Sequence, residues 1–464
     1  MPWNSNCKYK IEKRKNGDTK AQREWCRGAQ PCAPYYNVLG APTLKMRLSS
    51  QALLSPSWLR WYTSVISKKR LNMGPLDGIR VLDLSLYGPG RYCSMILADL
   101  GAEVITVEIP RTTGKMFSMM TSDTEPHYIG LNRNKKSIAV NLKKDEGKEI
   151  FYRLAQKVDV ILETNRPGAL KRRGMDYESV SKLNPRIIYC SITGYGQKGP
   201  YARRPGHDIN FVAMSGILGL SGSKNGPPCY LVSPMIADVL GGTNQAVISI
   251  LAALLARDRT GKGQYIDVSS TDGAVFYHWV HAPQFFLNGI SPERAESPTG
   301  SDVAWMNIYK AKDGKYFTIG CFEPWLWGNL CKLVGREDLI PKHFGSLEEQ
   351  RESYRALSEV FATKNRDEWL KLLDEADVCV APVYNFEEMF ADPHYKDHQI
   401  VVELEHPKLG KVKMLNTPFK LSDTPAAVRT RPPLWAEHTR EILHDLLGYS
   451  EKVINHLLKE EVIE

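Results

Sequence analysis

The chain has 464 residues, of which 42% are hydrophobic and 24% charged, and these fractions are typical of a folded globular protein of two or three domains. The longest apolar run, residues 246–256, is shorter than the roughly 18 residues that span a bilayer, so we expect no membrane insertion. Residues 1–73 hold 14 Lys or Arg and 3 Asp or Glu, whereas the rest holds 47 and 49. The net charge of +9 therefore belongs to the first 73 residues, which argues against nucleic-acid binding by the remainder.

Residues 1–73 form a basic leader that we set apart from the fold. No Asp or Glu occurs between Arg27 and Asn72, and the stretch from Met46 is rich in Arg, Ser and bulky apolar residues. This composition is typical of a mitochondrial transit peptide, so we expect a mitochondrial protein, with a cytoplasmic or peroxisomal location as the alternative. Because residues 1–45 do not resemble part of the same signal, an extension with no targeting role stays open.

From residue 74 the sequence alternates between strand and helix patterns. We predict strands at residues 78–85, 102–108, 137–142, 159–163 and 186–193, with helices at 92–100 and 146–156. Short β-branched strands separated by helices are typical of βαβ units, and therefore of an open, parallel, doubly wound α/β sheet. A long helix is predicted over residues 241–258, and residues 265–300 are predicted to hold a strand and a further helix.

A smaller α+β domain is predicted after this helix. Strand patterns at 308–311 and 315–320 flank a Lys-Asp-Gly turn, and helical patterns follow at 323–333, 346–362 and 366–376. After this domain we predict strands within 402–415 and a helix over 438–458. We therefore divide the chain into the leader (1–73), a large α/β domain (74–270), a linker (271–305), the small domain (306–400) and a return to the large domain (401–464).

Several common catalytic motifs are absent from the sequence. There is no GxSxG, no HExxH, no phosphate-binding lysine loop, and no GxGxxG after the first predicted strand, which argues against an ordinary dinucleotide-dependent enzyme. His278 and His281 lie three residues apart, but no carboxylate or cysteine nearby completes a metal site, so we interpret them as structural. The nine scattered cysteines, without a CxxC, indicate free thiols in a reducing compartment.

Three polar residues stand out at the ends of predicted elements. His207 lies in a Gly-His-Asp-Ile-Asn turn, Asp238 lies before the long helix, and Glu323 is a lone acid in an apolar run. Asp238 has two interpretations: a helix N-cap, worth about 1 kcal/mol, or a base whose neighbouring helix amides stabilise a negative substrate oxygen. A buried Glu323 would need a partner such as His207.

Six segments match, in order, the hallmarks of one protein family. They are residues 75–83 (PLDGIRVLD), 98–104 (ADLGAEV), 132–137 (NRNKKS), 166–168 (RPG), 194–200 (GYGQKGP) and 260–264 (TGKGQ). With them the chain resembles the family III CoA-transferases (CaiB/BaiF type), the group that also contains α-methylacyl-CoA racemase. The resemblance covers nearly all of residues 75–464.

The resemblance leaves two reactions to choose between. In the transferases, the aspartate at the position of Asp238 is a nucleophile that forms a mixed anhydride and then a CoA thioester. The racemases resemble this chain more closely in Gly-His-Asp-Ile-Asn and in Glu323-Pro324, and the glycine-rich loop of the transferases is not evident around residues 296–302. This implies a racemase that inverts the α-carbon of 2-methyl-branched acyl-CoA thioesters, in fatty-acid metabolism. CoA transfer through Asp238 is the alternative.

For the racemase, the resemblance implies a role for each of the three polar residues. His207 and Asp238 would exchange the α-proton from opposite faces, Glu323 would orient the imidazole, and the backbone amide of Asp238 would face the enolate oxygen. No metal or organic cofactor is expected beyond the CoA moiety of the substrate. A non-catalytic CoA-binding relative is a further alternative.

For CoA, the resemblance implies Lys143 and Arg172 as phosphate contacts, with Arg166 and Arg133 as further candidates; an ordinary solvated side chain is the alternative for each. The family commonly has Arg where this chain has Ile109, for which Arg111 is a candidate substitute, and the chain also departs from the family at Trp435-Ala436. The candidates for an acyl site, which are equally typical of plain core, are Phe211, Met306, Trp325 and Trp327.

The resemblance also implies an architecture. We expect a Rossmann-like large domain built from both chain ends, a smaller inserted α+β domain, and an interlocked homodimer. Glu323 would then reach His207 across the subunit interface.

Overall fold

The computed structural model describes residues 73–464 except 87, 113–121, 232, 234 and 295–302, and all described residues belong to one compact unit, residues 62–464. The transit peptide predicted within the leader and the loop interpreted at residues 296–302 lie outside the described residues.

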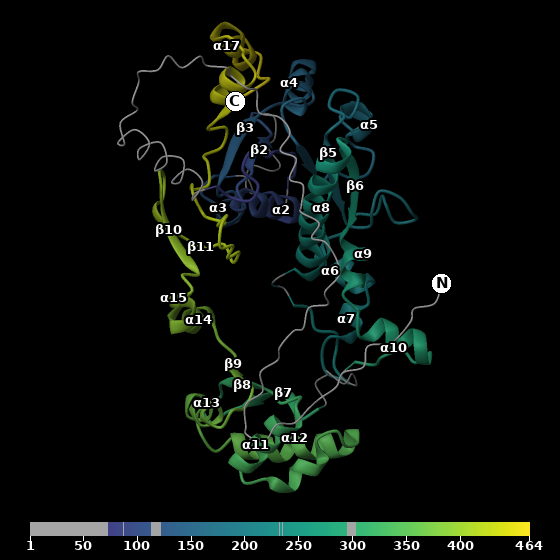
Figure 1. Ribbon diagram of the computed structural model, residues 1–464, viewed down its shortest axis with the longest axis vertical. Helices are drawn as coiled ribbons and strands as arrows, with labels where there is room; N and C mark the ends of the chain where they lie inside the picture. The colour runs from purple at the N-terminus through teal and green to yellow at the C-terminus, as the bar shows by residue number, and fades with distance from the viewer. Residues whose placement is uncertain (1–72, 87, 113–121, 232, 234, 295–302) are drawn as a thin grey trace, which may run out of the picture. The chain divides into compact units, whose positions relative to one another are not determined.

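The large domain is built on a six-stranded parallel sheet with the strand order β3-β2-β1-β4-β5-β6 (Figure 1). The strands are β1 (Arg80–Asp83), β2 (Glu103–Glu108), β3 (Lys135–Ala139), β4 (Val160–Glu163), β5 (Ile188–Thr193) and β6 (Gln264–Ser269). This confirms the predicted parallel, doubly wound sheet. The strand order reverses between β1 and β4, and in such sheets ligands bind at the carboxyl ends of the strands beside that point.

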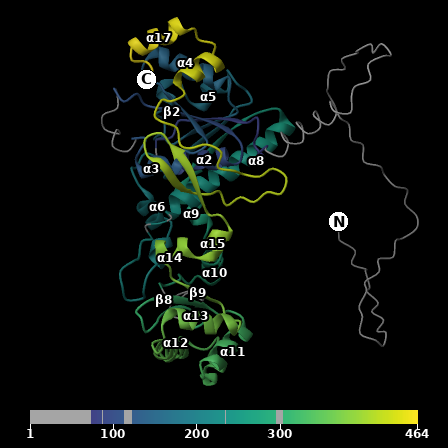
Figure 2. The same cartoon turned by 90° about the vertical axis from the view of Figure 1, so that its left-hand side faces the viewer.

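Helices cover both faces of this sheet, so the central residues of its inner strands are buried and apolar, as at Val81, Ile105 and Ile161. On one face, α4 (Asp145–Ala155) and α17 (Glu451–Lys459) share a hydrophobic cluster that contains Phe151 and Leu457. Figure 2 shows these two helices side by side, and a β-bridge joins Val140 to Ile463. The two ends of the described chain therefore meet in one domain.

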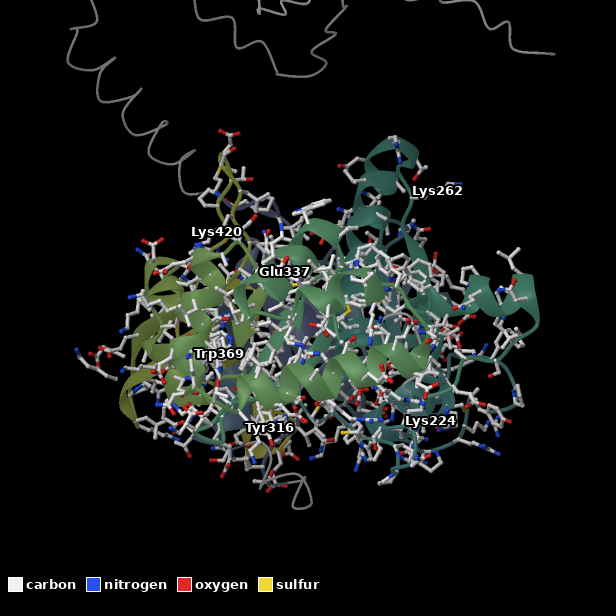
Figure 3. The ribbon with its side chains drawn as sticks, turned by 90° about the horizontal axis from the view of Figure 1, so that it is seen from below. Lys224, Lys262, Tyr316, Glu337, Trp369 and Lys420 are labelled. Atoms are coloured by element: carbon white, nitrogen blue, oxygen red, sulfur yellow. The ribbon has the colours of Figure 1, made fainter. Side chains whose placement is uncertain are left out.

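The other face carries α2 (Gly88–Asp99) and the longest helical stretch of the molecule. This stretch begins as a π-helix, η2 (Ala237–Asn244), and continues as α8 (Gln245–Thr260), where the sequence predicted a helix only from residue 241. The stretch is long and apolar enough to cross a membrane, but length and composition alone are weak grounds, because core helices pass the same test. Ile250 and Leu254 of α8 pack on the sheet, and Arg257 pairs with Asp159 at 2.9 Å. The turn after α8 holds Lys262, labelled in Figure 3.

A separate antiparallel sheet carries the predicted smaller α+β domain. Its strands are β7 (Met306–Lys310), β8 (Tyr316–Gly320) and β9 (Val380–Pro382), in the order β7-β8-β9. The helices α11 (Pro324–Leu333), α12 (Leu347–Phe361) and α13 (Arg366–Glu375) pack on it around Trp327 and Phe361. Trp369 of α13, labelled in Figure 3, donates its indole N–H to Phe361 O at 2.9 Å, which closes this core.

Shorter elements connect these parts. They are α3 (Pro126–Leu131), η1 (Lys171–Arg173), α5 (Tyr177–Val180), α6 (Asp208–Met214), α7 (Ile217–Leu220), α9 (Ser270–Phe276), α10 (His281–Asn288), η3 (Glu337–Lys342), α14 (Phe386–Ala391), α15 (Pro393–Asp397), the antiparallel pair β10 (Val401–His406) and β11 (Gly410–Leu415), α16 (Thr439–Glu441) and η4 (Ile442–Leu446). The helix predicted over residues 438–458 is interrupted at Gly448, whose φ of 72° lies in the left-handed region that favours glycine.

Candidate active site

His207 occupies the N-cap of α6 and is exposed. Its backbone is capped reciprocally: His207 N donates to Asn210 Oδ1 at 3.0 Å, and Asn210 N donates to His207 O at 2.8 Å. Gly206 precedes it because a Cβ there would lie 2.6 Å from the ring of Phe211. The Gly-His-Asp-Ile-Asn sequence therefore builds a helix start that presents the imidazole outside the helix.

Asp238 lies in the first turn of η2 and is half-buried. The N-cap position of this helical segment is held by Ile236, so the interpretation of Asp238 as a helix N-cap is wrong. The helical segment begins earlier than predicted, directly after Met235, which has a φ of 58°. π-helical segments are rare in proteins, and those that occur next to α-helical turns are frequently found at functional sites.

Two close contacts fix η2 in place. Its glycine Gly241 meets α9 backbone to backbone: a Cβ on Gly241 would lie 2.2 Å from Ser270 O, and a Cβ on Gly273 would lie 2.2 Å from Gly241 O. Thr243 Oγ1 donates to Pro89 O at 2.7 Å, which ties η2 to the first turn of α2. Asp238 is thus held near the carboxyl edge of the sheet, beside the turn between β1 and α2.

A buried carboxylate links the helices of His207 and Asp238. Asp208 Oδ1 accepts a hydrogen bond from Asp238 N at 2.8 Å, and Asp208 Oδ2 accepts one from Tyr230 Oη at 2.8 Å. The expectation that the amide of Asp238 faces a substrate oxygen is therefore wrong, because this carboxylate already accepts its hydrogen bond. Sequence reasoning missed Asp208 and Tyr230, although Asp208 lies inside the motif that singled out His207.

Asp238 lies near His207, because its backbone N–H donates to the side chain of Asp208, the next residue after His207. Burial raises the pKa of the Asp238 carboxyl, the negative charge of Asp208 raises it further, and the charge of His207 lowers it, with a net result of about 6. The structure therefore brings together two of the three residues proposed for catalysis.

Glu323 lies on the smaller domain, in the N-cap position before α11. Pro324 follows it at the first helical position, where a missing N–H costs nothing, and Trp327 N donates to Glu323 O at 3.2 Å. Across the described part of this single chain, neither a hydrogen bond nor an ion pair joins Glu323 to His207. Their pairing across a subunit interface stays a prediction.

Of the four CoA-phosphate candidates, Arg133 has a structural role. Its side chain is buried, its guanidinium pairs with Asp99 at 2.6 Å, and Nη1 donates to Leu415 O at 2.6 Å. These bonds join the end of α2 to the end of β11 and leave little of the guanidinium for a ligand, so we drop Arg133 from the phosphate candidates.

The other three candidates are exposed. Arg166 follows β4 and, with Lys171, Lys198 and Arg203, lines a cavity of about 380 Å³ that joins segments 166–168 and 194–200. Arg172 lies on η1, and Lys143 lies just before α4. Each of the three is placed where a phosphate could approach.

Arg111 and Trp435 account for two departures from the family pattern. Arg111 lies over the Trp435 ring at 5.3 Å, and its Nη2 is 3.3 Å from Asp123 Oδ2. Trp435 also packs against Tyr128, with ring centroids 6.1 Å apart. Arg111 therefore already has an aromatic and an acidic partner.

The aromatic candidates for an acyl site divide by burial. Trp327 and Phe211 are core residues, Met306 is half-buried, and Trp325 is 63% exposed. An apolar cavity of about 1010 Å³, which the sequence did not indicate, borders η2 at Val239, next to Asp238.

The two histidines interpreted as structural lie side by side, with ring centroids 6.1 Å apart. The imidazole of His278 is 2.9 Å from Ser215 O.

Comparison with known proteins identifies the family. A family model described as CoA-transferase family III matches residues 76–439. Succinyl-CoA:glutarate CoA-transferase of Homo sapiens is 35% identical over 406 residues, which cover 85% of this chain and 91% of that protein. Alpha-methylacyl-CoA racemase of Homo sapiens is 32% identical over 390 residues, which cover 84% of this chain and 97% of that protein. Transferases and racemases thus match at similar identity.

Solved structures agree. The crystal structure of a CAIB/BAIF family protein from Brucella suis superposes with a TM-score of 0.71 at 31% identity, covering 81% of this chain and 100% of that one. Rv3272 from M. tuberculosis superposes with a TM-score of 0.67 at 28% identity, covering 80% and 99%. The chain is therefore an enzyme, a transferase or a racemase, that belongs to CoA-transferase family III.

Proposed function

We propose that the protein is a racemase that inverts the α-carbon of 2-methyl-branched acyl-CoA thioesters. The observation that carries this proposal is the juxtaposition of His207 with an Asp238 carboxyl whose pKa is raised to about 6. Proton exchange in both directions needs two groups that each hold and release a proton near neutral pH. Histidine is the side chain that most often serves as a general acid or base, and burial beside Asp208 raises the pKa of the Asp238 carboxyl to about 6.

The reaction needs one proton removed and one returned. The Asp238 carboxylate takes the α-proton, and the electron pair of the C–H bond forms the enolate, whose charge lies mainly on the thioester oxygen. The protonated imidazole of His207 then delivers its proton to the opposite face of the same carbon, and the carbonyl is restored. Asp238 ends protonated and His207 neutral, which is the state that accepts the other hand of the substrate with the two roles exchanged.

The remaining parts of the site belong to the same proposal. Glu323 of a second copy would orient His207, and Lys143, Arg172 and Arg166 would contact the CoA phosphates. The cavity beside Val239 has mostly apolar walls and is large enough for a branched acyl group, although Arg133 and Lys413 also line it.

CoA transfer between carboxylic acids is the second candidate. It is favoured by the relatives named as transferases, one of which is 35% identical to this chain. In that reaction the Asp238 carboxylate attacks the thioester carbonyl, CoA leaves as the thiolate, and a mixed anhydride forms on Asp238.

Incubation of a 2-methylacyl-CoA with the enzyme in deuterated water separates the two reactions. A racemase replaces the α-hydrogen by deuterium and gives both epimers with no acceptor acid present. A transferase leaves the α-hydrogen in place and forms a new thioester only when a second carboxylic acid is added. Retained α-hydrogen together with acceptor-dependent transfer would contradict the racemase proposal. Binding without either reaction would identify a non-catalytic CoA-binding relative.

His207→Ala sharpens the same test. We expect it to slow α-hydrogen exchange by about 10² to 10⁴, the usual contribution of a positioned acid or base, while a transferase that uses Asp238 as nucleophile would keep much of its activity. Lys262→Ala, in an exposed turn after α8, is the matched control and should leave exchange unchanged.

A further inference from the structure

Asp208 is a buried carboxylate with an unusual set of neighbours. Its side chain is only 4% exposed, and it lies between α6 and η2 beside a small apolar cluster that includes Phe211 and Ala237. Its two oxygens accept one hydrogen bond each, from Asp238 N and from Tyr230 Oη, both at 2.8 Å. Within the described ranges of the chain it forms no ion pair with Lys or Arg.

A buried carboxylate without a cation is costly, so it needs other stabilisation. Two hydrogen bonds supply part of it, and the position of Asp208 at the first residue of α6 supplies more, because a helix N-terminus favours negative charge. Among the described residues, the Asp208 carboxylate next to Asp238 is therefore stabilised by hydrogen bonds and by its place at the helix start, and not by a cation.

The charge of Asp208 acts directly on Asp238. The groups whose charges act on this carboxyl are Asp208, which raises its pKa, and His207, which lowers it. Tyr230 lies on the far oxygen of Asp208, and its own pKa is raised to about 12 by burial and by that hydrogen bond. The other elements packed against η2 are α2, α8, α9, β5 and β6, and none of their described titratable groups is among those whose charges act on Asp238.

We propose that Asp208 is a positioning residue of the active site: its carboxylate, held between Asp238 N and Tyr230 Oη, fixes the backbone of Asp238 relative to His207 and places a second carboxylate beside it. The inference rests on the proposed proton exchange between these two residues. It adds that a third group, Asp208, contributes together with burial to the acid–base balance of the pair.

Asp208→Asn and Asp208→Glu separate charge from shape. Asparagine keeps an oxygen that accepts from Asp238 N and an amide that donates to Tyr230 Oη, but it removes the charge. For the substrate hand whose proton Asp238 removes, we expect the acidic limb of the pH–rate profile to move from about pH 6 to a lower pH. The shift should be only part of the way to the ordinary carboxyl value, because burial, the larger cause of the raised pKa, remains. Glutamate keeps the charge, so it should restore the position of that limb while lowering kcat, because its longer side chain displaces the Asp238 amide.

A merely structural role for Asp208 predicts something else. Asp208→Asn would then reduce the amount of folded enzyme equally at every pH and leave the limb in place, and this result would overturn the proposal. If Asp208→Asn does not fold, Asp208→Glu tests the proposal instead. A kcat equal to that of the wild type would overturn the positioning role. A lowered kcat, with the acidic limb of the pH–rate profile at its wild-type position, would support it.

A direct titration keeps this test independent of the reaction. In protein labelled with ¹³C-aspartate, the infrared difference between the wild type and Asp238→Asn isolates the Asp238 carboxyl band. We expect its midpoint to be lower in the Asp208→Asn background, and equal midpoints would overturn the inference. If the wild type exchanges no α-hydrogen, the proposed function has failed, but this titration still tests the action of Asp208.

Discussion

Two carboxylates of the large domain, the buried Asp83 and the half-buried Asp238, differ in the charge of their neighbours. Asp83 is the last residue of β1 and is completely buried. It accepts hydrogen bonds from Ser94 Oγ at 2.5 Å and from Ser85 N at 2.8 Å, and Lys135 Nζ lies 3.6 Å away. Lys135 and Arg91 lower its pKa against the effect of burial. Asp238 has a second carboxylate as its neighbour, and its pKa is raised to about 6. Burial favours the proton at both sites, so the sign of the neighbouring charge decides the outcome.

The cluster around Asp83 is structural in every contact. Arg91 pairs with Glu108 at 2.6 Å and donates to Ser85 O at 2.8 Å, and Lys135 Nζ donates to Arg91 O at 2.9 Å. These bonds close the turn between β1 and α2, whose Pro89 carbonyl holds η2 through Thr243. The cluster around Asp83 thus uses opposite charges to stabilise the turn between β1 and α2. The pair of Asp208 and Asp238 places like charges together, which favours a proton on Asp238.

Removing one charge from the paired region should have the largest effect. Lys135→Met leaves Asp83 buried without its lysine, and we expect the free energy of unfolding to fall by about 3–5 kcal/mol. Chemical denaturation at pH 7 measures it. Lys136→Met, at a neighbouring position whose lysine is partly exposed, is the control and should cost at most about 1 kcal/mol. If Lys135→Met lowers the free energy of unfolding by no more than Lys136→Met does, the contrast between the two regions is contradicted.

Removing the charge of Asp238 should act in the opposite direction. Because its pKa is raised in the folded state, the folded protein binds this proton more tightly than the unfolded chain does. Its ionisation therefore costs almost nothing below pH 4 and progressively more between pH 4 and 6. At pH 7 it costs nearly its full amount, about 3 kcal/mol. Asp238→Asn should raise the unfolding free energy by that amount at pH 7 and by nothing at pH 4, while α-hydrogen exchange is lost. Equal stability changes at both pH values would show that the carboxyl is not perturbed.

The smallest expected effect concerns the exposed arginine candidate for the CoA phosphates. Arg172→Ala should leave stability within about 0.5 kcal/mol and raise KM for acyl-CoA about tenfold, because a charge-assisted contact to a phosphate is worth about 1.5–3 kcal/mol. Arg133→Ala is the informative comparison, since it breaks a buried pair and should lower stability instead. An unchanged KM for Arg172→Ala would exclude this arginine from the CoA site.

The strands of the large sheet could be predicted because buried parallel strands are runs of β-branched and aliphatic residues. The same rule placed β3 two residues late, at residue 137, since Lys135 and Lys136 are charged. Lys135 belongs to the strand because Asp83, from another strand, supplies the opposite charge that lets it be buried. Arg133 was misassigned for the same reason: its partner Asp99 lies 34 residues away.

The sequence by itself determined the order of the α/β elements, the family, and the choice of His207 and Asp238, because periodicity and motifs are local properties of a chain. Only the tertiary structure decided which charged side chains form structural ion pairs and which carboxyl has a pKa raised toward neutral pH. That depends on distances of a few ångströms between groups such as Asp208 and Asp238, which lie 30 residues apart in the chain. Coulomb energies in a poorly solvated interior change steeply over such distances, and no local pattern encodes them.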